Sequence, residues 1–99
     1  MKVIYRPHLE KRLEERKIPR GYPKKIVQTP EQEYFDTLTK RSIAIKKLVF
    51  EREQRNILVA YDIIENTIEI VTIHVISNKE IENRIQVGRW RKYEKGTTN

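Results

Sequence analysis

The chain lacks cysteine, has only three glycines among 99 residues, and contains no long apolar run. Without cysteine, disulfides and thiolate metal sites are excluded, and nothing points to an oxidising compartment. Three glycines are too few for a glycine-rich phosphate loop or a nucleophile elbow. The N-terminus lacks the apolar core of a signal peptide, and no segment reaches the roughly 20 apolar residues that span a bilayer. We therefore expect a cytoplasmic protein that does not bind membranes.

Basic side chains are in excess, because 21 Lys and Arg stand against 14 Asp and Glu and give a net charge of +7. This charge favours a polyanionic partner without identifying it. The length predicts a single domain, residues 1–95, followed by a disordered tail at residues 96–99. A hydrophobic share of 37% predicts a thin core, which a partner or a dimer could extend.

The hydrophobic pattern predicts helices first and strands afterwards. Residues 2–5 predict a short strand, and Pro7 suits the first turn of a helix that ends near Lys17. A second short helix is predicted within residues 21–30, with Pro23 in its first turn. Stretches rich in β-branched and aromatic residues then predict four strands, at residues 33–38, 42–50, 56–64 and 67–77.

A final helix is predicted over residues 78–87, because Ser77 and Glu80 have the spacing of a capping box. Its buried stripe would be Ile81 and Ile85, with Gly88 in a left-handed cap. The predicted architecture is α+β: two N-terminal helices packed on one face of a four-stranded antiparallel sheet, with a C-terminal helix and a basic tail.

The last two strands permit a prediction of register, since Glu65 and Asn66 suit a two-residue hairpin loop. Four pairs would share one face and two pairs the other. The six predicted pairs are Ile63–Ile68, Tyr61–Ile70, Val59–Thr72 and Ile57–His74, then Leu58–Ile73 and Ala60–Val71. This register also sets Asp62 opposite Glu69, a like-charge pair that needs a cation from a neighbouring strand.

The first helix carries a stripe of cationic residues, since His8, Arg12 and Arg16 recur every four residues. The stripe borders the apolar pair Leu9 and Leu13. It could hold phosphate oxygens, with His8 able to carry a proton near neutral pH. Alternatively, the arginines pair with glutamates and His8 caps an edge of the core.

This stripe, the following short helix that ends in Thr29-Pro30, and the strand IEIVTIHVI resemble a small bacterial and phage family related to the RelE/ParE-like toxin superfamily, which includes RelE and BrnT. The resemblance implies a toxin of a toxin–antitoxin pair, acting on RNA that is either free or on the ribosome, and a cognate antitoxin as protein partner. It implies no cofactor and no metal.

RNA cleavage through the 2′-hydroxyl needs a base, an acid and cations on the phosphate. The residues expected to take part in catalysis are His74, Arg89, Tyr93 and His8. Those expected to bind RNA or its phosphates are Arg12, Arg16, Lys46, Lys47, Trp90, Arg91 and Lys92. In the tail, the ring of Trp90 could stack on a base.

Each of these assignments has a structural alternative. His74 could be a hydrogen-bonded histidine at a strand end, and Trp90 could pack onto the sheet and close the core. Lys46 and Lys47 could protect an edge strand from aggregation. The leading hypothesis is a RelE-like toxin that cleaves mRNA as a metal-independent endoribonuclease. The alternatives are a non-catalytic module that binds RNA or protein, and a toxin directed at gyrase.

Overall fold

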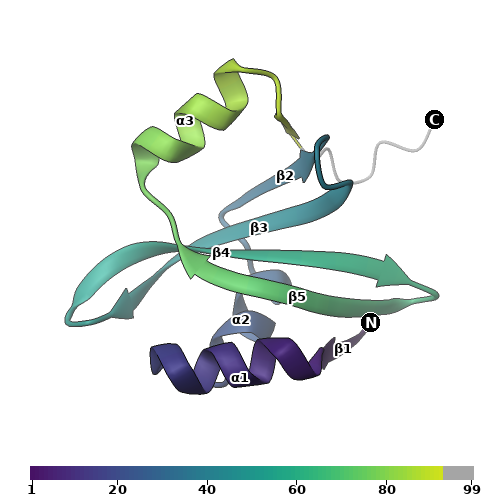
Figure 1. Ribbon diagram of the computed structural model, residues 1–99, viewed down its shortest axis with the longest axis vertical. Coiled ribbons are helices and arrows are strands. Elements are labelled where there is room, and N and C mark those ends of the chain that lie inside the picture. Colours follow the sequence, from purple (N-terminus) through teal and green to yellow (C-terminus); the bar gives the residue numbers. More distant parts are fainter. Residues whose placement is uncertain (93–99) are drawn as a thin grey trace.

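The computed structural model describes residues 1–92, which form a mixed six-stranded sheet with helices on both faces (Figure 1). The strand order is β1-β5-β4-β3-β2-β6. All neighbours are antiparallel except β1 and β5, which are parallel. The elements in chain order are β1 (Lys2–Tyr5), α1 (Pro7–Arg16), α2 (Tyr22–Gln28), β2 (Gln32–Asp36), β3 (Arg41–Phe50), β4 (Glu53–Ile64), β5 (Thr67–Val75), α3 (Asn78–Gln86) and β6 (Trp90–Lys92).

The prediction of a four-stranded, fully antiparallel sheet is therefore wrong. The four predicted strands form the centre of the sheet, but β1 adds a parallel edge beside β5 and β6 adds an antiparallel edge beside β2. Both edge strands are short and pair with segments far away in the sequence, so no local pattern shows the pairing. No strand was predicted in the basic tail that follows the last helix, yet Trp90–Lys92 form β6. Tyr93 and the predicted disordered tail, residues 96–99, lie outside the described residues.

Local sequence signals do account for the element boundaries. Pro7 occupies the first turn of α1, and Lys17 ends that helix in the left-handed region with a φ of 55°. The predicted capping box at the start of α3 is confirmed, because the Ser77 hydroxyl accepts from the Glu80 N–H while the Glu80 carboxylate accepts from the Ser77 N–H. Gly88, with a φ of 78°, follows α3 as predicted. The expected burial of Ile85 is wrong, since this side chain is 43% exposed.

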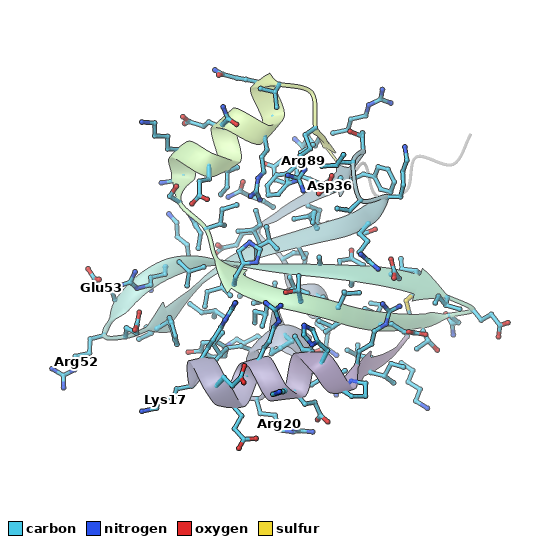
Figure 2. The ribbon with its side chains drawn as sticks, in the orientation of Figure 1. Lys17, Arg20, Asp36, Arg52, Glu53 and Arg89 are labelled. Atoms are coloured by element: carbon cyan, nitrogen blue, oxygen red, sulfur yellow. The ribbon has the colours of Figure 1, made fainter. Side chains whose placement is uncertain are left out.

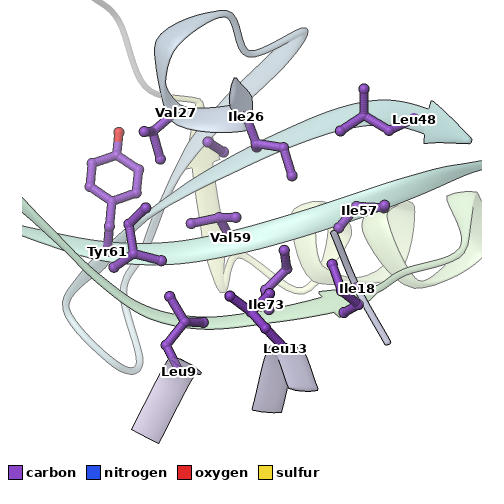
Figure 3. Close-up of a cluster of buried hydrophobic side chains, with 12 residues drawn as sticks. Leu9, Leu13, Ile18, Ile26, Val27, Leu48, Ile57, Val59, Tyr61 and Ile73 are labelled. Atoms are coloured by element: carbon purple, nitrogen blue, oxygen red, sulfur yellow. The ribbon is translucent and has the colours of Figure 1, made fainter. Parts of the chain in front are cut away.

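The sheet separates two apolar clusters. On one face, Leu9 and Leu13 of α1 and Ile26 of α2 pack on the sheet (Figure 3). On the other face, Ile81 of α3 and Trp90 pack on a smaller cluster. Among residues 1–92, the second face has only one helix, so the helices and strands of this part of the chain leave some of the sheet surface beside α3 uncovered (Figure 1). Within residues 1–92, no helix has both the length and the apolar character required to cross a membrane.

The β4–β5 hairpin follows the predicted register only as far as Ile70. Glu65 and Asn66 form the loop with φ values of 46° and 59°, and Tyr61 pairs with Ile70 as predicted. Beyond this point the ladder shifts, because Ala60 pairs with Thr72 and leaves Val71 without an opposite residue. The four predicted pairs beyond the bulge are therefore wrong; the observed ones are Ala60–Thr72, Val59–Ile73, Leu58–His74 and Ile57–Val75.

This β-bulge decides which face carries His74. Side chains alternate between faces along a strand, so one additional residue exchanges the faces of all residues that follow it. Ile70 and Ile73 both belong to the cluster under α1 and α2. Thr72 and His74 consequently lie on the face of α3, whereas the predicted register would have placed both under α1.

The predicted like-charge pair is present and has the cation that it needs. Asp62 lies opposite Glu69. Arg6 bridges the two carboxylates, with its Nε 3.1 Å from Glu69 and its Nη2 3.0 Å from Asp62. Arg41 of the neighbouring strand β3 lies 3.4 Å from Asp62. The edge strand β1 is thereby connected to the centre of the sheet by charge as well as by its backbone.

Candidate functional site

A cavity of about 160 Å³ opens on the face of the sheet that carries α3. Its apolar floor comes from the sheet. Its polar groups come from β2, the β2–β3 turn, β3, β5, α3 and the segment that follows α3. The floor residues are Ile43, Leu58, Ala60 and Val71, and the remaining lining residues are Asp36, Thr39, Arg41, Thr72, His74, Arg84, Arg89 and Trp90. Three of the residues expected from the sequence to act on RNA, His74, Arg89 and Trp90, thus meet at one cavity.

His74 is partly buried at this cavity in a strongly cationic environment. Burial is the largest cause that lowers the pKa of the His74 imidazole, and the positive charges of Arg84 and Arg16 lower it further. Arg12 acts in the same direction, and the carboxylate of Glu80 opposes it. The imidazole is therefore neutral at neutral pH and can accept a proton.

The arginines around His74 have no carboxylate partner among residues 1–92. The Nε of Arg12 donates to the imidazole Nε2 of His8 at 2.8 Å, and Arg16 donates to the backbone oxygen of Ile73 at 3.0 Å. Arg84 lies 5.1 Å from the ring centre of Trp90 and makes no hydrogen bond or ion pair in this part of the chain. The alternative in which Arg12 and Arg16 pair with glutamates does not apply within the described residues. Three guanidinium groups near a neutral imidazole form a site that favours an anion.

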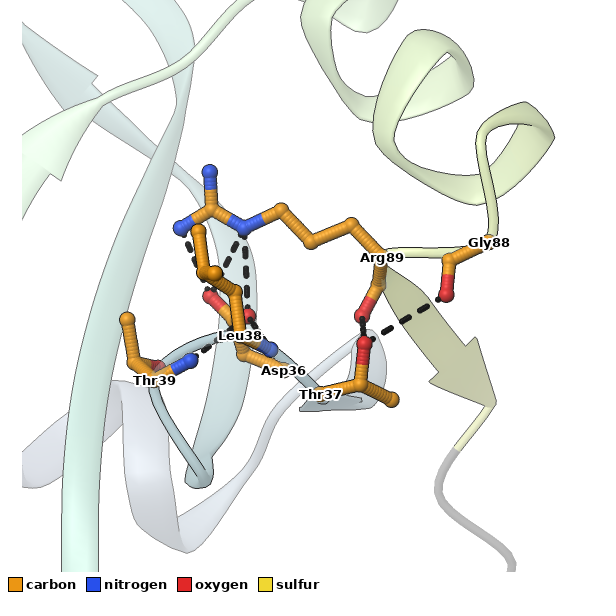
Figure 4. A network of polar contacts seen from close by, with 6 residues as sticks. All are labelled: Asp36, Thr37, Leu38, Thr39, Gly88 and Arg89. Carbon is orange, nitrogen blue, oxygen red and sulfur yellow. Dashed lines mark hydrogen bonds and ion pairs between the residues drawn. The ribbon is translucent and has the colours of Figure 1, made fainter.

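Arg89 is held by Asp36 beneath α3 (Figures 2 and 4). Its Nε donates to Oδ1 at 3.1 Å, and its Nη2 donates to Oδ2 at 2.9 Å. Asp36 Oδ1 also accepts the backbone N–H groups of Leu38 and Thr39. Burial alone would raise the pKa of Asp36, but the hydrogen bonds from Arg89 and from the two backbone groups lower it to about 2. Arg89 is therefore mainly a connection between the β2–β3 turn and the segment after α3.

Trp90 is buried, with 2% of its surface exposed, so it does not offer a free ring to a base. Tyr34 stacks on it with ring centres 5.3 Å apart, and the Arg84 guanidinium lies against the ring. The alternative predicted from the sequence, in which Trp90 closes the core, describes this arrangement. The Trp90 indole N–H has no acceptor within the described residues.

The other residues predicted to bind RNA do not line the cavity. Lys46 lies on the face of α2, where its Nζ donates to the carbonyl of Thr29 at 2.9 Å, near the C-terminal end of that helix. Lys47, Arg91 and Lys92 are exposed on β3 and β6. His8 is exposed on α1 and reaches the site only through Arg12.

Sequence reasoning did not select Arg84, Arg41, Thr72 or Thr39 as site residues. Arg84 follows the buried Ile81 by three residues, and this helical spacing directs it toward the sheet. The other three depend on the bulge and on the β2–β3 turn, for which the sequence offers only Asp36 followed by polar residues. In residues 1–92, no group of three or more His, Cys, Asp or Glu side chains could hold a metal ion.

Comparison with known proteins adds no relative to this description. No protein-family model matches the chain, no curated protein matches it, and no solved structure matches it.

Proposed function

We propose that the chain is an endoribonuclease in which His74 acts as the general base for RNA cleavage. The observation that carries this proposal is the convergence of Arg12, Arg16 and Arg84 on His74 without a carboxylate partner in the described part of the chain. Three cations that make no ion pair within residues 1–92 repel one another, and a phosphodiester would relieve this repulsion. A neutral imidazole among them is the group that a ribonuclease uses as a base.

The proposed reaction needs no metal, because RNA supplies its own nucleophile. His74 accepts the proton of a 2′-hydroxyl, the 2′ oxygen attacks the adjacent phosphorus, and the bond from phosphorus to the 5′ oxygen breaks. The products are a 2′,3′-cyclic phosphate and a 5′-hydroxyl end. Arg16 and Arg84 stabilise the additional negative charge on the phosphorane. Tyr93, outside the described residues, is our candidate donor of a proton to the 5′ oxygen.

The toxin assignment is part of the same proposal and is supported by the resemblance to RelE/ParE-like proteins. In this proposal the protein is cytoplasmic and cleaves mRNA, free or on the ribosome, and a cognate antitoxin covers the basic face. An acidic antitoxin would compete with RNA for Arg12, Arg16 and Arg84. The net charge of +7 supports both kinds of partner.

The test is cleavage of a 5′-labelled RNA by the purified chain, with the chemistry of the new ends determined. We expect His74→Gln to lower the cleavage rate by roughly 100-fold or more while RNA binding is retained. Arg16→Gln should weaken binding, and the matched control Lys11→Gln should not, because Lys11 is exposed on the same helix and points away from the sheet.

Two outcomes would contradict the proposal. If the wild type binds RNA and leaves it intact, with and without ribosomes, the non-catalytic module is the better account. If it neither binds nor cleaves RNA but inhibits supercoiling by gyrase, the target is gyrase.

A further inference from the structure

We infer that the cavity beside His74 is a pocket for one nucleobase and that its preferred base is guanine. This inference rests on the proposed function, because it assigns the cavity to the nucleotide whose phosphate the arginines would hold. It names a specificity site that the catalytic proposal does not require.

The size of the cavity suits a single planar base. A volume of about 160 Å³ corresponds to roughly five water molecules at about 30 Å³ each. This is well below the roughly 300 Å³ at which pockets for drug-sized ligands begin. The floor is apolar and is formed by Leu58 and Ala60 of β4 with Ile43 and Val71 on either side. An apolar floor with polar groups at the walls favours a flat heterocycle over an inorganic ion or a sugar.

Arg84 offers the surface on which a base can stack. Its guanidinium lies 5.1 Å from the ring centre of Trp90, and it makes no hydrogen bond or ion pair among residues 1–92. Trp90 is itself stacked on Tyr34. Guanidinium planes and aromatic rings are the two kinds of group on which proteins stack RNA bases. The buried Trp90 therefore supports one side of the Arg84 guanidinium, and a base would stack on the other side, away from the indole.

The polar groups of the cavity are mainly donors. Arg41 makes a single contact, from its Nε to Asp62 at 3.4 Å, and both of its terminal nitrogens have no partner among the described residues. Thr72 and Thr39 add hydroxyl groups. The carboxylate that lines the cavity, Asp36, already accepts from Arg89 and from two backbone N–H groups. The remaining acceptors of the cavity are the imidazole of His74 and the two threonine hydroxyls, so a base that turns an amino group toward Arg41 finds no acceptor there.

A donor-rich wall selects a base with adjacent acceptors. Guanine presents N7 and O6 side by side, and an arginine fork binds both together. Adenine replaces O6 with an amino group, which would face the guanidinium of Arg41. Cytosine has two adjacent acceptors, N3 and O2, but only one ring to stack on the guanidinium of Arg84, whereas guanine has two fused rings. Uracil has carbonyl oxygens, but they are separated by an N–H group. Among the four bases, guanine fits the fork of Arg41 best.

The experiment measures binding of the four nucleoside 5′-monophosphates by calorimetric titration, which is independent of cleavage. We expect guanosine monophosphate to bind at least roughly fivefold more tightly than the adenosine, cytidine and uridine forms, the lower end expected for one bidentate arginine contact. Arg41→Lys keeps the charge and removes the fork, so it should remove this preference while leaving affinity for inorganic phosphate within about twofold. Arg52→Lys, at the tip of the β3–β4 hairpin (Figure 2), is the matched control.

A second variant changes the floor of the cavity and leaves its charges in place; because Ala60 is buried, the folding of this variant is checked first by urea unfolding. Ala60→Leu fills the floor of the cavity with apolar atoms, and it should lower the affinity for the guanosine form to the level of the other three. Equal affinity of the wild type for all four nucleotides would overturn the inference. So would a preference that persists in both Arg41→Lys and Ala60→Leu.

The two proposals fail in different ways. If RNA is cleaved through His74 without a base preference, and the four nucleotides bind equally, the pocket inference is wrong and the ribonuclease stands. If guanosine monophosphate binds selectively and no RNA is cleaved, the pocket stands and the catalytic proposal is wrong.

Discussion

Replacing Arg89 by methionine removes the guanidinium from a buried carboxylate and keeps much of the aliphatic length of the side chain. Asp36 is only 2% exposed, and its pKa is lowered from 3.8 to about 2. This difference corresponds to roughly 2 kcal/mol of stability at neutral pH. Loss of one partner from a fully buried pair costs about 3 to 5 kcal/mol. Because the Arg89 side chain is 32% exposed, solvent screening reduces that cost, and we expect roughly 2 to 3 kcal/mol.

The assay is equilibrium unfolding in urea at neutral pH and at several acidic pH values. A carboxylate whose folded pKa lies below its unfolded pKa contributes stability above the unfolded value, and this contribution is lost as pH falls through the folded value. The difference between wild type and Arg89→Met should therefore be full above about pH 4 and shrink toward about pH 2. The control is Arg52→Met, an exposed arginine at the hairpin tip (Figure 2), which should change stability by less than about 0.5 kcal/mol.

An equal cost for Arg89→Met and Arg52→Met would refute the reasoning. It would also mean that Asp36 does not hold the Arg89 guanidinium in solution. Arg89 would then be free to bind phosphate, as the sequence predicts.

Two further predictions concern stability. The pKa of His74 is lowered, so the unfolded chain takes up a proton that the folded chain excludes. Wild type should therefore lose stability relative to His74→Gln as pH falls from about 7 to about 5. Parallel urea midpoints for the two proteins across this range would contradict the cationic environment. Arg6→Gln leaves Asp62 facing Glu69 without its bridging cation. We expect the free energy of unfolding in urea to fall by roughly 1 to 2 kcal/mol, and added salt to reduce this difference. A difference that does not depend on salt would show that packing, and not charge, explains the effect.

The sequence predicts those features of the fold that depend on neighbouring residues. The capping box at Ser77, the hairpin loop at Glu65 and the cation required by Asp62 are all local or come from adjacent strands, and all are present. The parallel pairing of β1 with β5 and the addition of β6 to β2 join distant segments. The four residues of β1, KVIY, and the three of β6, WRK, carry no signal that identifies their partner strands, so the sheet was predicted too small.

The site was predictable by residue type and not by arrangement. His74 was selected as a site residue, but its face depends on a bulge that neither glycine nor proline marks. Arg89 and Trp90 were selected as ligands of RNA, and the structure places them in ion-pair and core contacts instead. Arg84 was not selected, because the sequence does not show which surface of the sheet a single arginine on a short helix will face.

The extra residue at Val71 makes the site unusually sensitive to the length of β5. Substitutions in this strand change one side chain at a time, whereas deletion of a single codon before Thr72 would restore a regular ladder. Thr72 and His74 would then point into the layer under α1, and Ile73 would lie at the cavity. Every polar side chain of the site would still be encoded, yet the site would no longer exist. Deletion of one residue would therefore remove the proposed site while His74 and its neighbouring arginines stay in the sequence.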